Sequence, residues 1–410
     1  CLNTCAFLTS AVREGIDRIL ELAENKEQGR CKSLVVAGCM SERYRENLLN
    51  EMPEIDGLIG TSDFTDILHC VRSSLEKKER QAYFQNRAAE QRPVYSEKNH
   101  ISQRVLSTQQ HYAYLKISEG CSNMCSFCNI PHLRGLFQSR PMENILKEFS
   151  VLLDKGVKEI NLISQDSSSY GIEKLDHPGL HTLVQQLLDT GKDHDFWLRL
   201  FYSYPNRYPV ELFSLMRQDP RLVNYVDMPF QHISDSVLKK MNRKISRQKI
   251  EEIIEFGLKE VPDLSFRTTF IVGFPTETEK DFDELLAFVE KGYFHHIGVF
   301  TYSHEDNITS ARWGDPIPDE EKQRRRTAVM EAQQKVLAEK NQKMVGNQYR
   351  VLVEGTSTES DLLLEARTQY QGVDVDGIVY INEGEAQAGE FHQIEVVEAH
   401  PYDLIARVIE

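Results

Sequence analysis

The stretch CSNMCSFC, residues 121–128, places three cysteines at spacings of four and then three residues. It directly follows YAYLKIS (112–118), an apolar run typical of a buried strand. Five more such runs alternate with helical patterns as far as residue 302, which predicts a parallel sheet. Six strand–helix units favour an open, partial barrel over a closed eight-stranded one. The five runs are KEINLIS (158–164), FWLRLFY (196–202), NYVDMPF (224–230), LSFRTTFIVGF (264–274) and HIGVFTY (296–302).

The three cysteines lie at the carboxyl end of the first strand, the edge where parallel α/β folds carry their chemistry. A zinc site would usually take two pairs of ligands, and the redox-type pair Cys125–Cys128 would leave Cys121 unexplained. Three thiolates on one short loop fit an iron–sulfur cluster best. Three ligands for four irons leave one iron an open coordination position, which is typical of a catalytic centre.

Other segments flank this array. SLVVAG (33–38) predicts a buried strand, followed by a helix with Ser41 as its N-cap, and residues 67–75 predict a further helix. The polar stretch 76–110 suits a linker. A long charged helix is expected over 319–344, and β-type runs separated by Gly and Asp then predict a small all-β barrel. We therefore expect three domains, over residues 1–100 (with the linker), 107–341 and 342–410.

Composition narrows the class of protein. Hydrophobic residues make up 40% and charged residues 27% of the 410, as in globular proteins, and no apolar run is long enough to span a bilayer. Residues 1–30 carry charges throughout, unlike a signal peptide. Eight cysteines without an export signal indicate metal ligands or catalytic thiols in a reducing compartment, so we expect a cytoplasmic protein without a membrane partner.

Charge is unevenly distributed. The whole chain carries −15, and residues 342–410 hold four Lys/Arg against thirteen Asp/Glu, a net −9. Such acidity argues against a generic nucleic-acid binder, whose binding surface would be basic.

The motif CSNMCSFC, with the aromatic Phe127 before its last cysteine, resembles the radical S-adenosylmethionine (SAM) enzymes. The resemblance implies that Cys121, Cys125 and Cys128 bind a [4Fe–4S] cluster, whose open iron chelates SAM and whose electron cleaves it to a 5′-deoxyadenosyl radical. YLKISEGCSNMCSFCNIPHLRG (114–135), ISQDSSSYG (163–171) and TFIVGFPTETEKDF (269–282) look like the signature blocks of the methylthiotransferases. The terminal β-barrel resembles their TRAM domain.

NTCAF (3–7) and VAGCM (36–40) look like the methylthiotransferase N-terminal domain, which carries a second [4Fe–4S] cluster. The resemblance makes Cys5 and Cys39 ligands of this auxiliary cluster. The third ligand belongs to a Gly-Cys motif upstream of NTCAF, and Cys1 is not a substitute for it. Either the sequence is a fragment, which we expect, or the protein lacks a complete second cluster. Cys31 and Cys70 match no motif and are expected to be small hydrophobic residues.

Several polar residues lie at the predicted carboxyl ends of strands. They could bind cofactor or substrate, or only satisfy neighbouring loops; they are Gln165, Asp166, Arg199, Gln231 and His232. Gly273 either allows close backbone approach near the cofactor or simply ends a strand. His295–His296 is expected to start a surface strand, and Arg324–Arg326 to be a solvated helix face. No proton-transferring residue is singled out.

Two branches of the methylthiotransferases share this architecture. One modifies an adenosine of tRNA (MiaB-type); the other, RimO-type, modifies the β-carbon of an aspartate in ribosomal protein S twelve of the small subunit. YVDMPFQHIS (225–234) and VFTYSHE (299–305) resemble the RimO-type blocks. The acidic terminal domain would repel RNA and attract a basic ribosomal protein, so no stable nucleic-acid binding is expected. A non-catalytic iron–sulfur paralogue is the remaining alternative. An electron donor such as flavodoxin is also expected.

Overall fold

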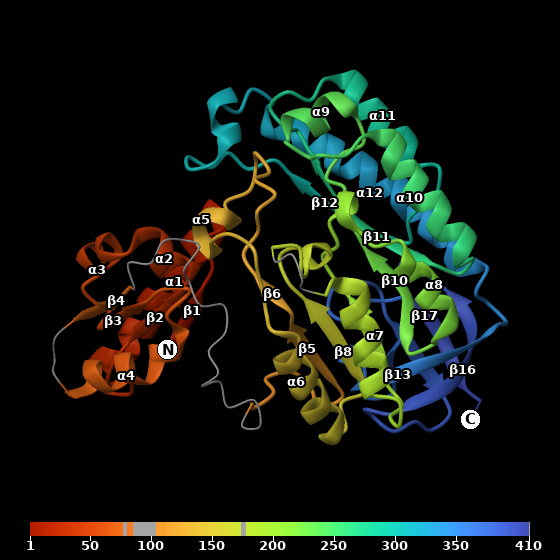
Figure 1. Ribbon diagram of the computed structural model, residues 1–410, viewed down its shortest axis with the longest axis horizontal. Coiled ribbons are helices and arrows are strands. Elements are labelled where there is room, and N and C mark those ends of the chain that lie inside the picture. Colours follow the sequence, from red (N-terminus) through yellow and green to blue (C-terminus); the bar gives the residue numbers. More distant parts are fainter. Residues whose placement is uncertain (77–79, 85–103, 174–177, 410) are drawn as a thin grey trace. The chain divides into compact units, whose positions relative to one another are not determined.

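The computed structural model describes residues 1–76, 80–84, 104–173 and 178–409 (Figure 1). Contacts group them into two compact units, which we describe separately. The first comprises residues 1–100, 118–140 and 303–312, and the second comprises residues 101–117, 141–302 and 313–410. The predicted domain limits at 100, 107 and 342 stay predictions, and much of the predicted linker lies outside the described residues. In these described ranges no helix is both long and apolar enough to cross a membrane.

The first unit is built on a parallel four-stranded sheet in the order β1-β2-β3-β4. Apolar side chains of its strands and helices form one core, which also takes in Leu133 from α5. The strands are β1 (Leu2–Thr4), β2 (Val35–Gly38), β3 (Gly57–Ile59) and β4 (Gln81–Tyr83), and the helices are α1 (Thr9–Glu27), α2 (Cys39–Tyr44), α3 (Glu46–Glu51), α4 (Ile67–Glu76) and α5 (Ile130–Arg134). A short antiparallel ribbon, β6 (Ser118–Glu119) with β7 (Gln138–Ser139), frames the segment 118–140, which we call the cysteine loop.

The strand predicted at 33–38 and the helix predicted at 67–75 are present as β2 and α4. The prediction of Ser41 as an N-cap was wrong, because α2 already begins at Cys39. Gly38 turns the chain with φ 97°, and a Cβ on it would lie 2.6 Å from the Thr4 carbonyl oxygen. The Ser41 hydroxyl instead donates to the carbonyl of Val36 at 2.9 Å. A glycine turn, not a side-chain cap, therefore starts this helix.

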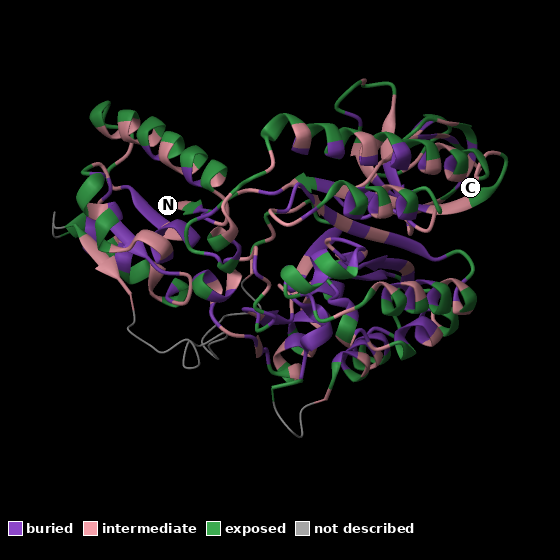
Figure 2. Ribbon diagram, turned by 90° about the horizontal axis from the view of Figure 1, so that it is seen from above, coloured by how far each residue is buried: buried purple, intermediate pink, exposed green. Residues whose placement is uncertain are grey.

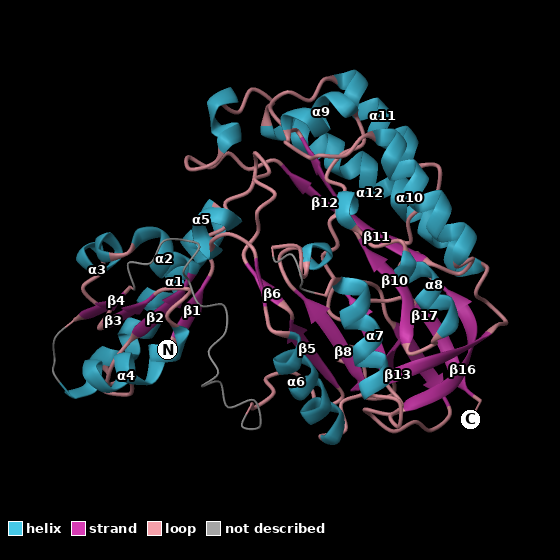
Figure 3. Cartoon of the chain, in the orientation of Figure 1, coloured by secondary structure: helices cyan, strands magenta, loops and turns pink. Residues whose placement is uncertain are grey.

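The second unit contains the predicted six-stranded parallel sheet, in the order β12-β11-β10-β9-β8-β5 (Figures 1 and 3). Every predicted run forms a strand: β5 (Tyr112–Lys116), β8 (Glu159–Ile163), β9 (Trp197–Leu200), β10 (Leu222–Asp227), β11 (Ser265–Val272) and β12 (His296–Thr301). Strands β5 and β12 are its two edges, as expected of an open, partial barrel.

Helices cover the outer face of this sheet. They are α6 (Met142–Asp154), α7 (Leu180–Thr190), α8 (Glu211–Gln218), α9 (Asp235–Lys240), α10 (Arg247–Glu260), α11 (Glu279–Val289) and α12 (Asp319–Gln342). Their apolar faces pack on alternate strand residues such as Ile160, Leu198 and Phe266, which are completely buried in the largest core (Figure 2). Each fully buried side chain of this size contributes roughly 1.5–3 kcal/mol.

The remaining strands close into a five-stranded barrel, β13-β14-β15-β17-β16. They are β13 (Gln348–Thr356), β14 (Leu364–Thr368), β15 (Val379–Glu383), β16 (Phe391–Ala399) and β17 (Leu404–Val408). The barrel packs on the face of the sheet opposite the helices, which we call the inner face. Leu352 of β13 joins Trp197, Phe201 and Tyr225 of the sheet in one apolar cluster. The predicted α/β architecture with a terminal all-β barrel is confirmed.

Candidate functional site

The cysteine loop holds the three thiols of the CxxxCxxC motif. Cys121 is buried, whereas Cys125 and Cys128 are partly exposed, and all three are in the thiol form rather than in disulfides. The Cys128 amide donates to the Cys125 carbonyl at 3.1 Å, which closes a turn. The Asn123 side-chain amide donates to the Cys121 sulfur at 3.4 Å. Phe127 is partly buried beside Cys128. Backbone turns therefore present three soft ligands from one segment.

This donor set fits a [4Fe–4S] cluster. Over the described residues, no group of three or more His, Cys, Asp or Glu side chains is arranged to hold a single metal ion. A cluster does not require that arrangement, because each thiolate binds a different iron. Three thiols on one loop supply the soft ligands that iron–sulfur clusters require.

Cys5 and Cys39 lie at the carboxyl ends of neighbouring strands in the first unit. Thr4 pairs with Gly38 in the ladder between β1 and β2, so the residue after each strand is one of these cysteines. Arg134 of the cysteine loop hydrogen-bonds to Cys39 and forms an ion pair with Glu119 at 3.5 Å. Burial raises the pKa of the Cys39 thiol, and the positive charge of Arg134 opposes this effect. The unit therefore gathers two of the predicted auxiliary ligands beside a cation.

In the second unit, Gln165 and Asp166 follow β8 at the carboxyl edge of the sheet. The Asp166 carboxylate accepts a hydrogen bond from the Ser169 hydroxyl at 2.6 Å, which in turn accepts one from Arg207 at 2.9 Å. The Gln165 side-chain oxygen is buried without a hydrogen-bond partner among the described residues, so it could accept a hydrogen bond from a ligand.

Gln231 and His232 follow β10 at the same edge. Gln231 has φ 74°, and its backbone bridges to β11 through the Thr269 carbonyl at 2.8 Å. His232 is completely buried, and burial lowers its pKa to about 3. Its Nδ1 accepts a hydrogen bond from the Ser234 amide at 3.0 Å, and its Nε2 lies 3.9 Å from Glu277. His232 is therefore neutral and part of the loop's internal structure.

Glu277, which the sequence did not single out, stabilises the turn that follows β11. Its carboxylate accepts from the Phe274 amide at 3.1 Å and from Arg325 at 2.9 Å. Burial raises its pKa to about 7, against the opposing effect of Arg325. Arg325 is itself buried, so the prediction that residues 324–326 form a solvated helix face was wrong for this member.

Gly273 is required by backbone conformation and by packing. It has φ 74°, and a Cβ on it would lie 2.4 Å from Cγ of Lys322 in α12. The close approach therefore involves a helix of this chain. Binding of the cofactor by the backbone of Gly273 stays a prediction.

Arg199 does not lie free at the carboxyl edge. It is completely buried on the inner face, where it pairs with Glu159 at 2.7 Å and donates to the Gln369 carbonyl of the barrel at 2.8 Å. Arg367 of the barrel binds the other oxygen of Glu159. Burial alone would raise the pKa of Glu159, but Arg367 and Arg199 together lower it to about 2. These contacts give Arg199 a structural role, and we leave it out of the proposed cofactor site.

A group of polar residues that sequence reasoning missed lies on the inner face near the carboxyl edge. Asp227 ends β10, and its carboxylate accepts from Arg267 of β11 and from the Tyr202 amide, both at 3.1 Å. Tyr202 follows β9 with φ 60°, a conformation rare for a residue with a bulky side chain. The available signal in the sequence was a charged residue, Asp227 or Arg267, inside each of two predicted strands.

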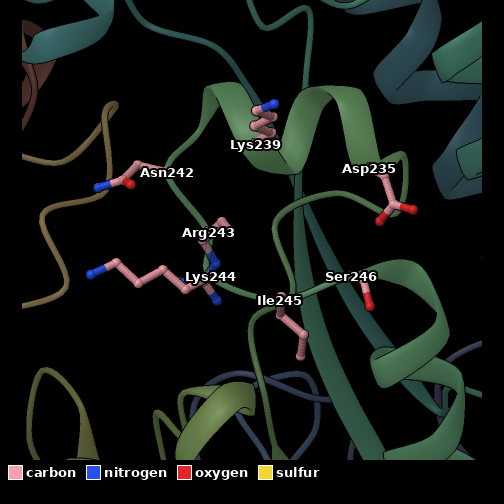
Figure 4. Close-up of a pocket in the computed structure, with 7 residues that line it drawn as sticks. All are labelled: Asp235, Lys239, Asn242, Arg243, Lys244, Ile245 and Ser246. Atoms are coloured by element: carbon pink, nitrogen blue, oxygen red, sulfur yellow. The ribbon is translucent and has the colours of Figure 1, made fainter.

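An exposed hollow of about 540 Å³ lies between α9 and α10 (Figure 4). The lining residues belong to the segment that leaves the carboxyl end of β10 and leads to α10. The hollow therefore lies on the carboxyl-edge side of the sheet. Three of its lining side chains are cationic, in a chain whose net charge is −15. The lining residues are Asp235, Lys239, Asn242, Arg243, Lys244, Ile245 and Ser246.

Comparison with protein families agrees with this architecture. A model of the radical SAM superfamily matches residues 115–289, and a model of the TRAM domain matches residues 345–409. A model described as uncharacterized protein family UPF0004 matches residues 1–60. The open parallel sheet and the three-thiol loop thus define a radical SAM enzyme, a class that implies an iron–sulfur cluster and SAM. We refer to the five-stranded barrel as the TRAM barrel from here on.

Full-length relatives specify the family. Ribosomal protein uS12 methylthiotransferase RimO of Geobacter sulfurreducens is 40% identical over 408 residues, covering 100% of this chain and 89% of the relative. The protein of that name from Myxococcus xanthus is 42% identical over 413 residues, covering 100% of this chain and 83% of the relative. The chain therefore belongs to the RimO family of radical SAM methylthiotransferases.

Among solved structures, the radical SAM methyltransferase TsrM from Kitasatospora setae, with cobalamin and a [4Fe–4S] cluster bound, is similar in fold. The match covers 68% of this chain and 57% of that protein at 11% identity, with a TM-score of 0.51. At this identity the match supports the fold alone.

Proposed function

We propose that this protein adds a methylthio group to the β-carbon of an aspartate in ribosomal protein uS12. The observation that carries the proposal is about 40% identity over the entire chain to proteins named for this activity. The acidic TRAM segment, with thirteen Asp/Glu against four Lys/Arg, supports a basic protein partner over RNA.

We assign the cluster to Cys121, Cys125 and Cys128 of the cysteine loop. When bound, the cluster and SAM would supply the one-electron chemistry that activates the substrate carbon. Asn123, which donates to the Cys121 sulfur at 3.4 Å, would hold that thiolate and lower its electron-donating power. Phe127 beside the last cysteine would limit access of water to the loop.

We further propose a second [4Fe–4S] cluster at Cys5 and Cys39. Arg134 would donate a hydrogen bond to the Cys39 thiolate and help to balance the cluster's negative charge. Gln165 and the backbone at Gln231 and Gly273 are proposed to bind SAM along the carboxyl edge of the sheet.

An acidic one-electron donor, such as a flavodoxin, is the proposed reductant. The hollow with Lys239 and Lys244 offers a cationic docking surface at the carboxyl edge, which suits such a partner. The reducing chemistry and the cysteine usage are those of a cytoplasmic protein. Reduction by the donor should slow as ionic strength rises, whereas reduction by dithionite should not.

The test uses protein reconstituted with iron and sulfide without oxygen, then given dithionite and SAM. Full-length uS12 and a tRNA anticodon stem-loop are offered separately, and both are read by mass spectrometry. A methylthio mass gain on an aspartate of uS12 alone is the expected result. A gain on the RNA would overturn the assignment. Deoxyadenosine without either product would indicate an iron–sulfur protein that lacks sulfur insertion. A variant with Cys121, Cys125 and Cys128 all replaced by Ala is the control for background chemistry.

A further inference from the structure

The segment of the TRAM barrel between β14 and β15, residues 369–376, lies on the inner face of the sheet. The Tyr370 carbonyl accepts from the Ser265 hydroxyl at 3.1 Å and is 2.8 Å from the His296 ring. The Gln369 carbonyl accepts from Arg199 at 2.8 Å. We call this segment the barrel loop. It contacts side chains of three different strands of the sheet, so it is part of the structure that shapes the inner face.

Asp376 is the buried carboxylate of the barrel loop. Its side chain is 1% exposed. One carboxylate oxygen accepts from the Tyr225 hydroxyl at 2.7 Å and from the Gly372 amide at 2.8 Å. The other accepts from Nε of Arg267 at 3.3 Å and lies 3.5 Å from the His296 ring. Because the buried Asp376 carboxylate accepts from Tyr225, Gly372 and Arg267, it fixes the positions of these three donors.

Arg267 continues the chain of contacts toward the carboxyl edge. Its Nε is bound to Asp376, while its Nη1 donates to Asp227 at 3.1 Å. The Asp227 side chain is completely buried. Its second oxygen accepts from the backbone amide of Tyr202 at 3.1 Å. Three consecutive charge-assisted contacts thus connect a carboxylate of the TRAM barrel with the backbone of Tyr202.

Tyr202 is the strained end of this chain of contacts. Its φ of 60° is held by the hydrogen bond from its amide to Asp227, and its side chain is 46% exposed. Burial raises the pKa of its phenol, and so does the negative charge of Asp227. The phenol also raises the pKa of Tyr114 on β5, after the larger effects of burial and Asp374. Because Tyr202 directly follows Phe201 at the end of β9, its half-exposed ring lies at the carboxyl edge of the sheet.

We propose that Tyr202 contacts the protein substrate and that Asp376 of the TRAM barrel is a positioning residue that holds Tyr202 in place through Arg267 and Asp227. This inference rests on the proposed function. A half-exposed phenol at this edge offers one hydroxyl donor and one aromatic face to a peptide segment. Its hydrogen-bond partner would be a carbonyl or carboxylate oxygen of the substrate segment that carries the aspartate.

The experiment compares Y202F, Y202A, D376N and the double variant Y202A/D376N in the reconstituted enzyme. E260Q is the control, because Glu260 is a partly exposed residue of α10, outside the TRAM barrel, whose side chain pairs with Arg217 at 3.2 Å. Four quantities are measured: the melting temperature, deoxyadenosine formed without substrate, kcat and KM for uS12, and the affinity for uS12 in a direct binding assay.

We expect D376N to lower kcat/KM for uS12 by about tenfold through misplacement of Tyr202. Deoxyadenosine formed without substrate should be unchanged. Y202A should show a similar loss, and the double variant should be no worse than Y202A, because both substitutions break one chain of contacts. Y202F should retain the aromatic contact and lose only the hydroxyl contribution. E260Q should behave as the wild type.

The proposal would be overturned if the fold loss in kcat/KM of the double variant equalled the product of the two single losses, since Asp376 and Tyr202 would then act independently. A D376N variant that melts at a lower temperature yet keeps the wild-type KM and affinity would also overturn it. If D376N does not fold, Y202A against Y202F still decides whether Tyr202 contacts substrate. If the wild type neither modifies nor binds uS12, the proposed function fails and this inference fails with it. A wild type that binds uS12, together with a Y202A variant of equal affinity and activity, rejects this inference alone.

Discussion

At the scale of single residues, the cysteine thiols proposed as cluster ligands give the clearest prediction. Cys121→Ala, Cys125→Ala and Cys128→Ala should each abolish deoxyadenosine formation, because two thiolates cannot hold a cluster that keeps one iron open for SAM. Cys39→Ala should keep deoxyadenosine formation and lose the methylthio product. The measurements are cluster absorbance, iron content and product mass. Cys31→Ala is the matched control, since that thiol only donates to the Ser33 carbonyl at 3.3 Å. Product from the Cys39→Ala variant would contradict a role for an auxiliary cluster there.

His232 gives a pH dependence of stability. Burial lowers its pKa to about 3 in the folded protein, from an ordinary value of 6.5. The folded state therefore resists protonation, so this group has no effect above about pH 6.5 and destabilises the fold increasingly as the pH falls below that value. The loss should reach about 2 kcal/mol near pH 5. Urea denaturation of wild type and H232N between neutral and mildly acidic pH measures it, because the Asn oxygen can still accept from the Ser234 amide. Equal pH slopes would contradict the assignment.

Single residues could be assigned from the sequence only where the signal is local. The three thiols of the cysteine loop could be identified because their spacing is local. Arg199 shows the opposite case: its position near the end of a strand could be predicted, but its partner Glu159 lies 40 residues away and Arg367 lies 208 residues from Glu159. Strand periodicity indicates that a side chain faces one side of a sheet and does not indicate which domain covers that side. Tyr202 and Asp227 were missed for the same reason.

At the scale of elements, the turn after β11 depends on its fit against α12. Gly273→Ala should destabilise the second unit by about 2–4 kcal/mol, because it combines φ 74° with a Cβ only 2.4 Å from Lys322. Gly156→Ala is the matched control, with φ 83° and no atom within 4 Å, so it reports the backbone cost alone. Thermal unfolding of both variants separates the two costs. Equal losses would show that Lys322 moves aside freely.

Elements were the most predictable level of this molecule. All six sheet strands could be read from apolar runs, because a parallel strand buried on its outer face needs them. Strand β17 was among the elements that went unpredicted. The segment 404–408 contains only five residues of mixed polarity, and its role in closing the barrel depends on β15 and β16. The predicted start of α2 failed because a tight glycine turn replaced the expected serine cap.

At the scale of the whole molecule, charge should govern capture of the substrate. The exposed carboxylates of the TRAM barrel include Glu359, Glu383, Glu385 and Glu398. Neutralising these four to Gln should lower kcat/KM for uS12 several-fold at low ionic strength and flatten its salt dependence, since screening acts beyond about 8 Å at physiological salt. Steady-state kinetics across a salt series measures this, and deoxyadenosine formed without substrate should not change. A salt dependence identical to the wild type would remove the electrostatic argument for a basic partner.

The two edge strands of the sheet have a consequence for the kind of substrate that can be processed. Each of β5 and β12 carries a ladder on one side only, so among the described strands the wall around the inner face is not a closed hydrogen-bonded ring. A closed ring is entered only through its two mouths. An incomplete one is also open along the gap between its edge strands, which leaves more room for a bulky partner. The architecture therefore suits a substrate residue that is presented on a folded protein.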